Sequence, residues 1–162
     1  RGRGGRLVHP HAVLLTRFYE AFARGDAEAM VACYHPEAAF SDPAFGLLDH
    51  AHVCGMWRML LARARDLRVT FTVRAADDER GEVAWEARYP FSRSGRPVHN
   101  IIPGQFGFKD GLILAHRDGF DLHAWAKQAL GWKGSLLGGM GWFQRSLQAQ
   151  ARKGLAAYLA GS

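Results

Sequence analysis

The chain has 162 residues, of which 48% are hydrophobic and 22% charged, which is typical of one soluble globular domain. Its formal net charge is +6, but the basic residues are scattered and form no known nucleic-acid-binding motif, so we expect no nucleic acid as a partner. No apolar run approaches the roughly 18 residues of a membrane helix, and the Arg/Gly-rich start lacks the apolar core of a signal peptide. We expect a cytoplasmic protein in which Cys33 and Cys54 are buried thiols and residues 1–10 are a disordered tail or an expression remnant.

Apolar residues at helical spacing predict three helices in the first half of the chain. The expected helices span residues 11–24, 27–34 and 50–65, with an irregular stretch or a short strand over residues 37–48. Gly25 followed by Asp26 indicates the end of the first helix and the N-cap of the second. Asp49 is the expected N-cap of the third helix.

The hydrophobic period then changes from 3.6 to 2, which indicates β-strands. Four strands are expected, over residues 67–73, 83–91, 98–108 and 112–120. Short turns rich in Gly, Asp and Ser separate them, and consecutive strands joined by short turns form an antiparallel meander. Three helices followed by such a meander predict an α+β fold.

The C-terminal quarter has a different composition. Residues 122–130 predict a short helix, residues 131–142 are rich in Gly and Trp, and residues 143–159 predict an amphipathic helix. Three roles are open for this segment: a lid over a pocket, a dimer contact, or a surface that touches lipid. A lid or dimer contact is favoured over membrane contact, because an amphipathic helix of a globular chain usually buries its apolar face on protein.

Three motifs occur in a particular order. They are Arg17-Phe-Tyr-Glu-Ala-Phe-Ala-Arg-Gly-Asp26, Tyr34-His-Pro-Glu-Ala-Ala-Phe-Ser-Asp-Pro43 and Phe108-Lys-Asp-Gly-Leu-Ile-Leu-Ala-His-Arg-Asp-Gly-Phe-Asp-Leu122. Together they resemble the nuclear transport factor 2-like superfamily, in particular its SnoaL-like branch, which is related to ketosteroid isomerase and limonene epoxide hydrolase. The resemblance covers about residues 11–130. It implies a cone-like curved antiparallel sheet, wrapped by N-terminal helices around an apolar pocket and often paired as a homodimer. Residues 131–162 would be an extra helical segment packed on this domain or on a partner.

Asp42 is one candidate catalytic residue. It matches the general base of ketosteroid isomerase-like proteins, in which an apolar pocket raises the pKa of the carboxyl group. A turn role is the alternative, because Asp-Pro is a common turn element. The two donors that hold the enolate in those proteins fall at Phe18 and Gly104, and Tyr19 is rotated by about 100° from the first of them. The resemblance therefore argues against a steroid isomerase mechanism.

Asp118 is the second candidate and matches the water-activating base of limonene epoxide hydrolase-like proteins. Strand alternation puts His116, Asp118 and Phe120 on one face, so His116 would accompany Asp118 into the pocket. A structural ion pair or a turn-capping role is the alternative. Asp121 is a rival for the same role, because a sequence pattern sets the register only to within a residue or two.

The other hydrolase residues are not matched, because the Arg and the second Asp of that pattern fall near Trp85 and Ala87. SnoaL-like cyclases instead close a ring by an aldol step in which an aspartate serves as acid and base. The resemblance implies that Asp118, assisted by His116 or Asn100, could perform such a step.

We predict a protein that binds a small apolar molecule, with Asp118 moving protons and Asp42 and His116 in support. The alternative is a non-catalytic binding or protein-interaction module. The expected pocket residues, for each of which plain core packing is the alternative, are Phe18, Tyr19, Trp57, Phe71, Trp85, Tyr89, Asn100, Ile102, Gly104, Phe106 and Phe120. The histidine pairs lack neighbouring ligands at metal spacing and no nucleotide-binding Gly pattern occurs, so neither a metal nor a cofactor is expected.

Overall fold

The computed structural model describes residues 8–161. Its helices are α1 (Pro10–Ala23), α2 (Ala27–Val31), α3 (His50–Arg63), α4 (Leu122–Leu130), α5 (Trp132–Leu137) and α6 (Gly141–Ala160). Its strands are β1 (Tyr34–Asp42), β2 (Gly46–Leu48), β3 (Arg68–Ala76), β4 (Arg80–Pro90), β5 (Pro97–Lys109) and β6 (Leu112–Asp118). Most of the expected N-terminal tail, residues 1–7, lies outside the described residues. The first helix already begins at Pro10, a position where the missing N–H of proline costs nothing.

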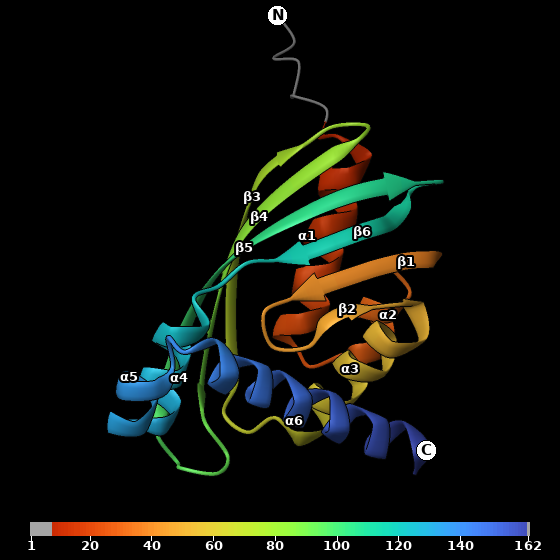
Figure 1. Ribbon diagram of the computed structural model, residues 1–162. Helices are drawn as coiled ribbons and strands as arrows, with labels where there is room; N and C mark the ends of the chain where they lie inside the picture. Colours follow the sequence, from red (N-terminus) through yellow and green to blue (C-terminus); the bar gives the residue numbers. More distant parts are fainter. Residues whose placement is uncertain (1–7, 162) are drawn as a thin grey trace, which may run out of the picture.

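One curved sheet, in the order β2-β1-β6-β5-β4-β3, wraps around α1 (Figure 1). The predicted meander is confirmed, because β3, β4, β5 and β6 each pair antiparallel with the next strand along the chain. The sheet continues beyond the meander, since β1 pairs with β6 in parallel and β2 pairs antiparallel with β1. The sheet remains open, and the α+β cone-like fold class is confirmed.

The second helix is shorter than the sequence pattern predicted. It ends at Val31, and Tyr34, which was expected in its last turn, begins β1 instead. A residue that precedes proline disfavours helical backbone, so the chain is already extended at His35. The residues that follow alternate between buried and exposed positions. The stretch predicted as irregular or a short strand, residues 37–48, therefore contains most of β1, which ends at Asp42, then a turn and the short strand β2.

Aromatic side chains fill the inside of the cone. The first helix contributes a broad apolar face, whose buried residues are Leu14, Leu15, Phe18, Tyr19, Ala21 and Phe22. Trp57 reaches the same core from α3, and Trp85 and Phe106 reach it from β4 and β5. Full burial of a large apolar side chain contributes about 1.5–3 kcal/mol, so this cluster is a main source of the stability of the fold.

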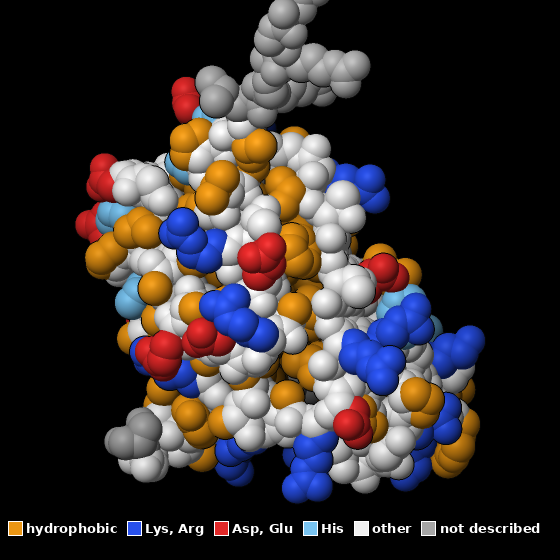
Figure 2. All heavy atoms as spheres, turned by 180° about the vertical axis from the view of Figure 1, so that it is seen from behind, with side chains coloured by type: hydrophobic (Ala, Val, Ile, Leu, Met, Phe, Trp, Pro, Cys, Tyr) orange, Lys and Arg blue, Asp and Glu red, His pale blue; other side chains and the backbone are white. Residues whose placement is uncertain are grey.

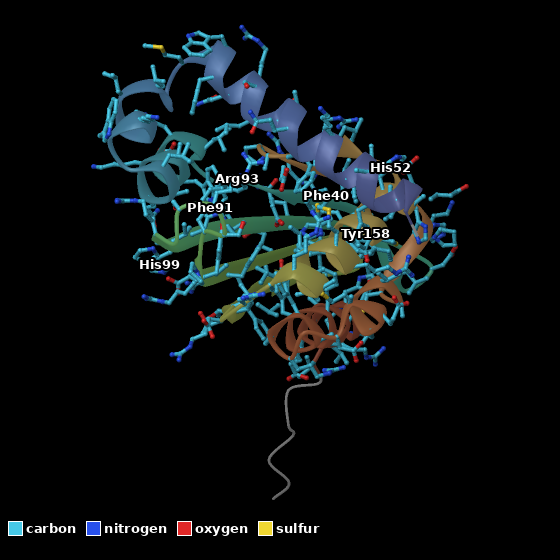
Figure 3. The ribbon with its side chains drawn as sticks, turned by 90° about the horizontal axis from the view of Figure 1, so that it is seen from below. Phe40, His52, Phe91, Arg93, His99 and Tyr158 are labelled. Carbon is cyan, nitrogen blue, oxygen red and sulfur yellow. The ribbon has the colours of Figure 1, made fainter. Side chains whose placement is uncertain are left out.

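The C-terminal helix lies across one end of the domain. Figure 1 shows α6 passing beside α3 and β2, and Figure 3 shows Tyr158 on its side toward α3. The guanidinium of Arg63 lies 5.7 Å from the Tyr158 ring centroid, and Leu155 is buried. Nη1 of Arg152 donates hydrogen bonds to the carbonyls of Phe45 and Leu47 at 2.7 and 3.2 Å. The apolar side of α6 thus packs on its own domain.

Candidate functional site

A buried histidine–aspartate pair lies on β6, inside the cone. Strand alternation places His116 and Asp118 on the inner face, where they are 2% and 5% exposed. Nε2 of His116 lies 2.9 Å from Oδ1 of Asp118. The rival residue, Asp121, is exposed, and its carboxylate accepts a hydrogen bond from the amide of Ala124 as the N-cap of α4. Of the two aspartates, Asp118 is therefore the one that faces the interior.

A chain of hydrogen bonds extends from this pair to two tryptophans. The Tyr34 hydroxyl lies 2.8 Å from Nδ1 of His116 and accepts a hydrogen bond from Nε1 of Trp57 at 2.9 Å. On the other side, Nε1 of Trp85 donates to Oδ1 of Asp118 at 3.2 Å. Indole nitrogens can only donate, so the arrangement that uses every proton has Tyr34 donating to Nδ1 and the protonated Nε2 donating to Asp118. This network fixes the tautomer of His116 and the orientation of the carboxylate.

Aromatic rings surround the His116 imidazole. The Phe106 ring stacks on it at a centroid distance of 4.3 Å, and the Trp57 indole is stacked at 6.5 Å. Phe18 and Phe40 present their edges to it at 5.7 and 5.0 Å. In surroundings of such low polarity, electrostatic interactions are stronger than in water, so a displaced proton would have a large effect on the neighbouring groups.

Asp42 approaches the same region from β1. The parallel pairing sets Phe40 beside His116, so Asp42, two residues further on, points to the side on which Asp118 lies. Its Oδ1 accepts a hydrogen bond from the Phe45 amide at 2.6 Å. Burial, followed by the nearby negative charge of Asp118, raises the pKa of Asp42 to about 6, although the Phe45 amide opposes the change. Asp42 can therefore gain or lose a proton close to neutral pH.

The Tyr19 hydroxyl is the third feature of the site. It is buried and, alone among the buried side-chain polar atoms that the structure describes, it has no hydrogen-bond partner. A Cβ atom at Gly104 would lie 3.1 Å from this hydroxyl and 3.2 Å from Oδ1 of Asp118. Burial, and secondarily the charge of Asp118, raises the pKa of Tyr19 well above its ordinary value. The hydroxyl of Tyr19 and the carboxylate of Asp118 thus both adjoin Gly104, in a space that is too tight for an added carbon atom unless a neighbouring side chain moves.

The sequence pattern had placed Tyr19 away from the donor position. Locally the argument is correct, because consecutive helical residues differ by about 100°. The sheet, however, wraps so far around α1 that Phe18 and Tyr19 are both fully buried. Sequence reasoning also missed Tyr34, whose hydroxyl joins His116 to Trp57, because it placed this residue in a helix.

The expected pocket residues line the interior of the cone, where side chains are closely packed. Seven are buried, namely Phe18, Tyr19, Trp57, Trp85, Ile102, Gly104 and Phe106, and four are half-buried, namely Phe71, Tyr89, Asn100 and Phe120. Two surface hollows of about 540 and 450 Å³ include predicted site residues in their lining, Tyr89 in the first and Phe106 and His116 in the second, but Asp118 lines neither. The apolar pocket thus remains a prediction.

In the described part of the chain, no cluster of three or more His, Cys, Asp or Glu side chains could hold a metal ion.

The comparisons with known proteins agree with the fold. A family model described as a SnoaL-like domain matches residues 15–116, and no functionally curated protein sequence matches the chain. A protein with a ketosteroid isomerase-like fold from Catenulispora acidiphila is 14% identical, with a TM-score of 0.62, over 72% of this chain and 91% of its own. A candidate polyketide cyclase from Xanthomonas campestris is 20% identical, with a TM-score of 0.63, over 74% and 96%. An LEH-like epoxide hydrolase from M. tuberculosis is 17% identical, with a TM-score of 0.58, over 80% and 91%.

Proposed function

The chain belongs to the SnoaL-like domain family, and from this premise we propose that it is an enzyme that moves a proton on a small apolar carbonyl compound. One observation carries the proposal. The unpartnered hydroxyl of Tyr19 and the carboxylate of Asp118 both adjoin Gly104, and a substrate would reach both groups once these closely packed side chains move apart. A hydrogen-bond donor and a base that meet at one point, in apolar surroundings, are what proton abstraction beside a carbonyl group requires.

In the proposed reaction, the Asp118 carboxylate takes a proton from the carbon next to the substrate carbonyl. The electron pair moves to the carbonyl oxygen, and the Tyr19 hydroxyl donates a hydrogen bond to this developing oxyanion. The resulting enolate either accepts the proton at another carbon, which is an isomerisation, or attacks a second carbonyl, which closes a ring. In the second case Asp118 returns the proton to the new alkoxide, so no other reactant is needed. A positioned base is typically worth about 10²–10⁴ in rate and an oxyanion donor about 10²–10³.

The remaining groups support this chemistry. His116 and Trp85 hold the Asp118 carboxylate in one orientation through their hydrogen bonds to Oδ1. Asp42, with a pKa of about 6, can exchange a proton with solvent from the edge of the site. This assignment keeps Asp118 as the base, with Asp42 and His116 in support.

A second function is favoured by the packing of the interior. Asp118 is satisfied by two donors within the protein, and neither surface hollow includes it. A domain in which this network is purely structural would be a binding or interaction module without chemistry. The two functions make different predictions for proton exchange on a bound ligand.

Ligand binding and proton exchange can be tested together. Thermal shift on the wild type would screen steroids, aromatic polyketide-like ketones, terpenoid epoxides and fatty acids, because a ligand of the folded state raises the melting temperature. For each ketone that binds, NMR in D₂O would follow deuterium uptake beside the carbonyl. Enzyme-dependent exchange that Asp118→Asn abolishes supports catalysis, with Asp121→Asn as the control from the same segment. Binding without exchange in the wild type supports the binding module instead.

A further inference from the structure

Helix α5, the turn after it and the start of α6 carry a concentrated group of exposed apolar side chains. We call the residues Trp132, Leu136, Met140 and Trp142 the Trp corner, and they are 72, 65, 42 and 55% exposed. The other large hydrophobic side chains that the structure shows as exposed are spread over the rest of the molecule: Val8, Val13, Leu47, Leu60 and Ile101. Single exposed apolar residues are ordinary, but four within eleven residues, two of them tryptophan, indicate a binding surface.

The Trp corner is separate from the part of the C-terminal segment that packs on the domain. In Figure 1, α5 and the start of α6 form a projecting corner, whereas the later part of α6 lies beside α3. The buried residue of α6 is Leu155, more than three turns after Trp142. The amphipathic helix therefore buries the apolar side of its later part on protein and leaves its own start and α5 uncovered.

The chain segment that carries the Trp corner is basic. From Leu122 to Gly161 the chain has no acidic residue and five basic ones, which are Lys127, Lys133, Arg145, Arg152 and Lys153. Lys133 lies beside the corner, with its Nζ 5.8 Å from the Trp132 ring centroid, and Arg145 follows Trp142 by one helical turn. Neither Lys133 nor Arg145 forms a salt bridge with another described residue. Figure 2, the view from behind, shows Lys and Arg side chains gathered at this corner next to hydrophobic ones.

We propose that the Trp corner docks the protein on an anionic lipid bilayer. Tryptophan is the residue that most favours the interface between headgroups and acyl chains, and neighbouring Lys and Arg are attracted to anionic headgroups. Docking would be peripheral, because no helix among residues 8–161 is long and apolar enough to cross a bilayer. A stable protein–protein contact needs about 800 Å² per partner, which suits a broad face, whereas a projecting corner suits shallow insertion into lipid. This surface does not depend on the proposed enzymatic function.

Vesicle co-sedimentation tests the proposal. The full chain is mixed with vesicles of phosphatidylcholine alone, or of equal parts phosphatidylcholine and phosphatidylglycerol, at low and at physiological salt. We expect partitioning onto the anionic vesicles that weakens with salt, and little onto the neutral ones. Trp132→Ser/Trp142→Ser is expected to reduce the partition coefficient about tenfold or more, because the inserted apolar area is lost. Lys133→Glu/Arg145→Glu is expected to reduce it by about thirtyfold or more, at roughly tenfold per 1.4 kcal/mol and about 1 kcal/mol per basic residue.

Matched variants distinguish binding by the Trp corner from nonspecific adsorption by other exposed apolar or basic side chains. Leu47→Ser/Ile101→Ser removes two apolar side chains that are 70 and 64% exposed, and Arg17→Glu/Arg74→Glu removes two exposed basic residues elsewhere. Both should bind vesicles as the wild type does, and circular dichroism should show the same fold in every variant. The proposal is overturned if the wild type ignores anionic vesicles at low salt, or if the matched variants lose as much binding. It is equally overturned if the corner variants abolish a dimer, seen by analytical ultracentrifugation, in a protein that does not bind lipid.

Discussion

Nε2 of His116 lies 2.9 Å from Oδ1 of Asp118, two residues along the same strand, and both side chains are almost completely excluded from solvent. The indole of Trp85 donates to the same carboxylate oxygen. The two donors are Nε2 of His116 and Nε1 of Trp85, and both are buried. Because Nδ1 of His116 accepts the hydrogen bond of Tyr34, the proton of His116 is on Nε2, and Asp118 is the acceptor for both donors. The carboxylate therefore contributes to stability as well as to the proposed chemistry, and the two contributions can be separated by substitution.

Asp118→Ala should lower the free energy of unfolding by about 2–6 kcal/mol, because it leaves two buried donors without an acceptor, at about 1–3 kcal/mol each. Asp118→Asn retains a carbonyl oxygen that can accept both hydrogen bonds and should lose less than half as much. Urea unfolding monitored by circular dichroism measures both values. Equal losses in the two variants would mean that the negative charge, and not the hydrogen bonds, stabilises the network.

Asp42 predicts a pH dependence of stability with a definite sign. Its pKa of about 6 in the folded protein lies above the usual 3.8, so the folded state binds this proton more tightly than the unfolded chain. The stability that this proton contributes is fully present below about pH 4 and is lost as the pH rises through about 6. The shift corresponds to at most about 3 kcal/mol, which partial solvent exposure reduces to about 1–2 kcal/mol.

The matched variant is Asp42→Asn, which keeps an oxygen acceptor for the Phe45 amide and cannot ionise. We expect it to unfold with the same free energy as the wild type near pH 4, and to be about 1–2 kcal/mol more stable at pH 8. Urea titrations of both proteins across this range measure the difference, in which the pH responses of the other carboxyl groups cancel. A difference that does not change with pH would show that Asp42 does not titrate near neutrality.

Gly104→Ala tests the position shared by the hydroxyl and the carboxylate. The added Cβ would lie 3.1–3.2 Å from Tyr19, Phe106 and Asp118, so it should cost about 1–3 kcal/mol of stability and fill the proposed ligand position. Gly107→Ala, on the same strand, is the control, because its Cβ would meet the nearest atom, Cβ of Ala115, at an ordinary 3.5 Å. Thermal shift with a compound that binds the wild type measures the effect. If Gly104→Ala binds that compound normally, the ligand does not occupy this position.

Local patterns were sufficient to predict most of the secondary structure. The N-caps at Asp26 and Asp49 are confirmed by hydrogen bonds from the amides of Ala29 and His52, and the four meander strands are where the alternation predicts them. Such signals are visible in sequence because they depend on residues a few positions apart. The parallel pairing of β1 with β6 joins segments more than 70 residues apart, and no local pattern encodes it.

In the candidate site, too, local patterns predict some features, whereas others depend on the tertiary fold. Alternation alone placed His116 and Asp118 on one face, and the structure puts both inside the cone. The participation of Tyr34 could not be predicted, because it requires both the parallel pairing and the position of Trp57 on α3. Tyr19 was predicted to point inward, and it is fully buried. The approach of its hydroxyl to Gly104 and Asp118 depends on how far the sheet wraps around α1, which is a property of the whole fold.

Tyr19→Phe gives the most direct separation of stability from function. The substitution removes one buried oxygen that has no hydrogen-bond partner and leaves the ring contacts with Phe71 and Trp85 intact. An unpaired buried hydroxyl costs about 1–3 kcal/mol, so the variant should be as stable as the wild type or more stable by up to that amount. If the hydroxyl holds the oxyanion, the same variant should lose about 10²–10³ in the rate of proton exchange on a bound ketone.

Urea unfolding and deuterium exchange followed by NMR measure the two effects on the same preparation. Tyr34→Phe is the comparison, since its hydroxyl is hydrogen-bonded to His116 and Trp57 and its removal should destabilise the protein by about 1–3 kcal/mol. A loss of stability in Tyr19→Phe would mean that the hydroxyl has a partner in solution, and an unchanged exchange rate would remove Tyr19 from the reaction. A gain in stability together with slower exchange is the outcome expected of a donor that the fold keeps available for the substrate.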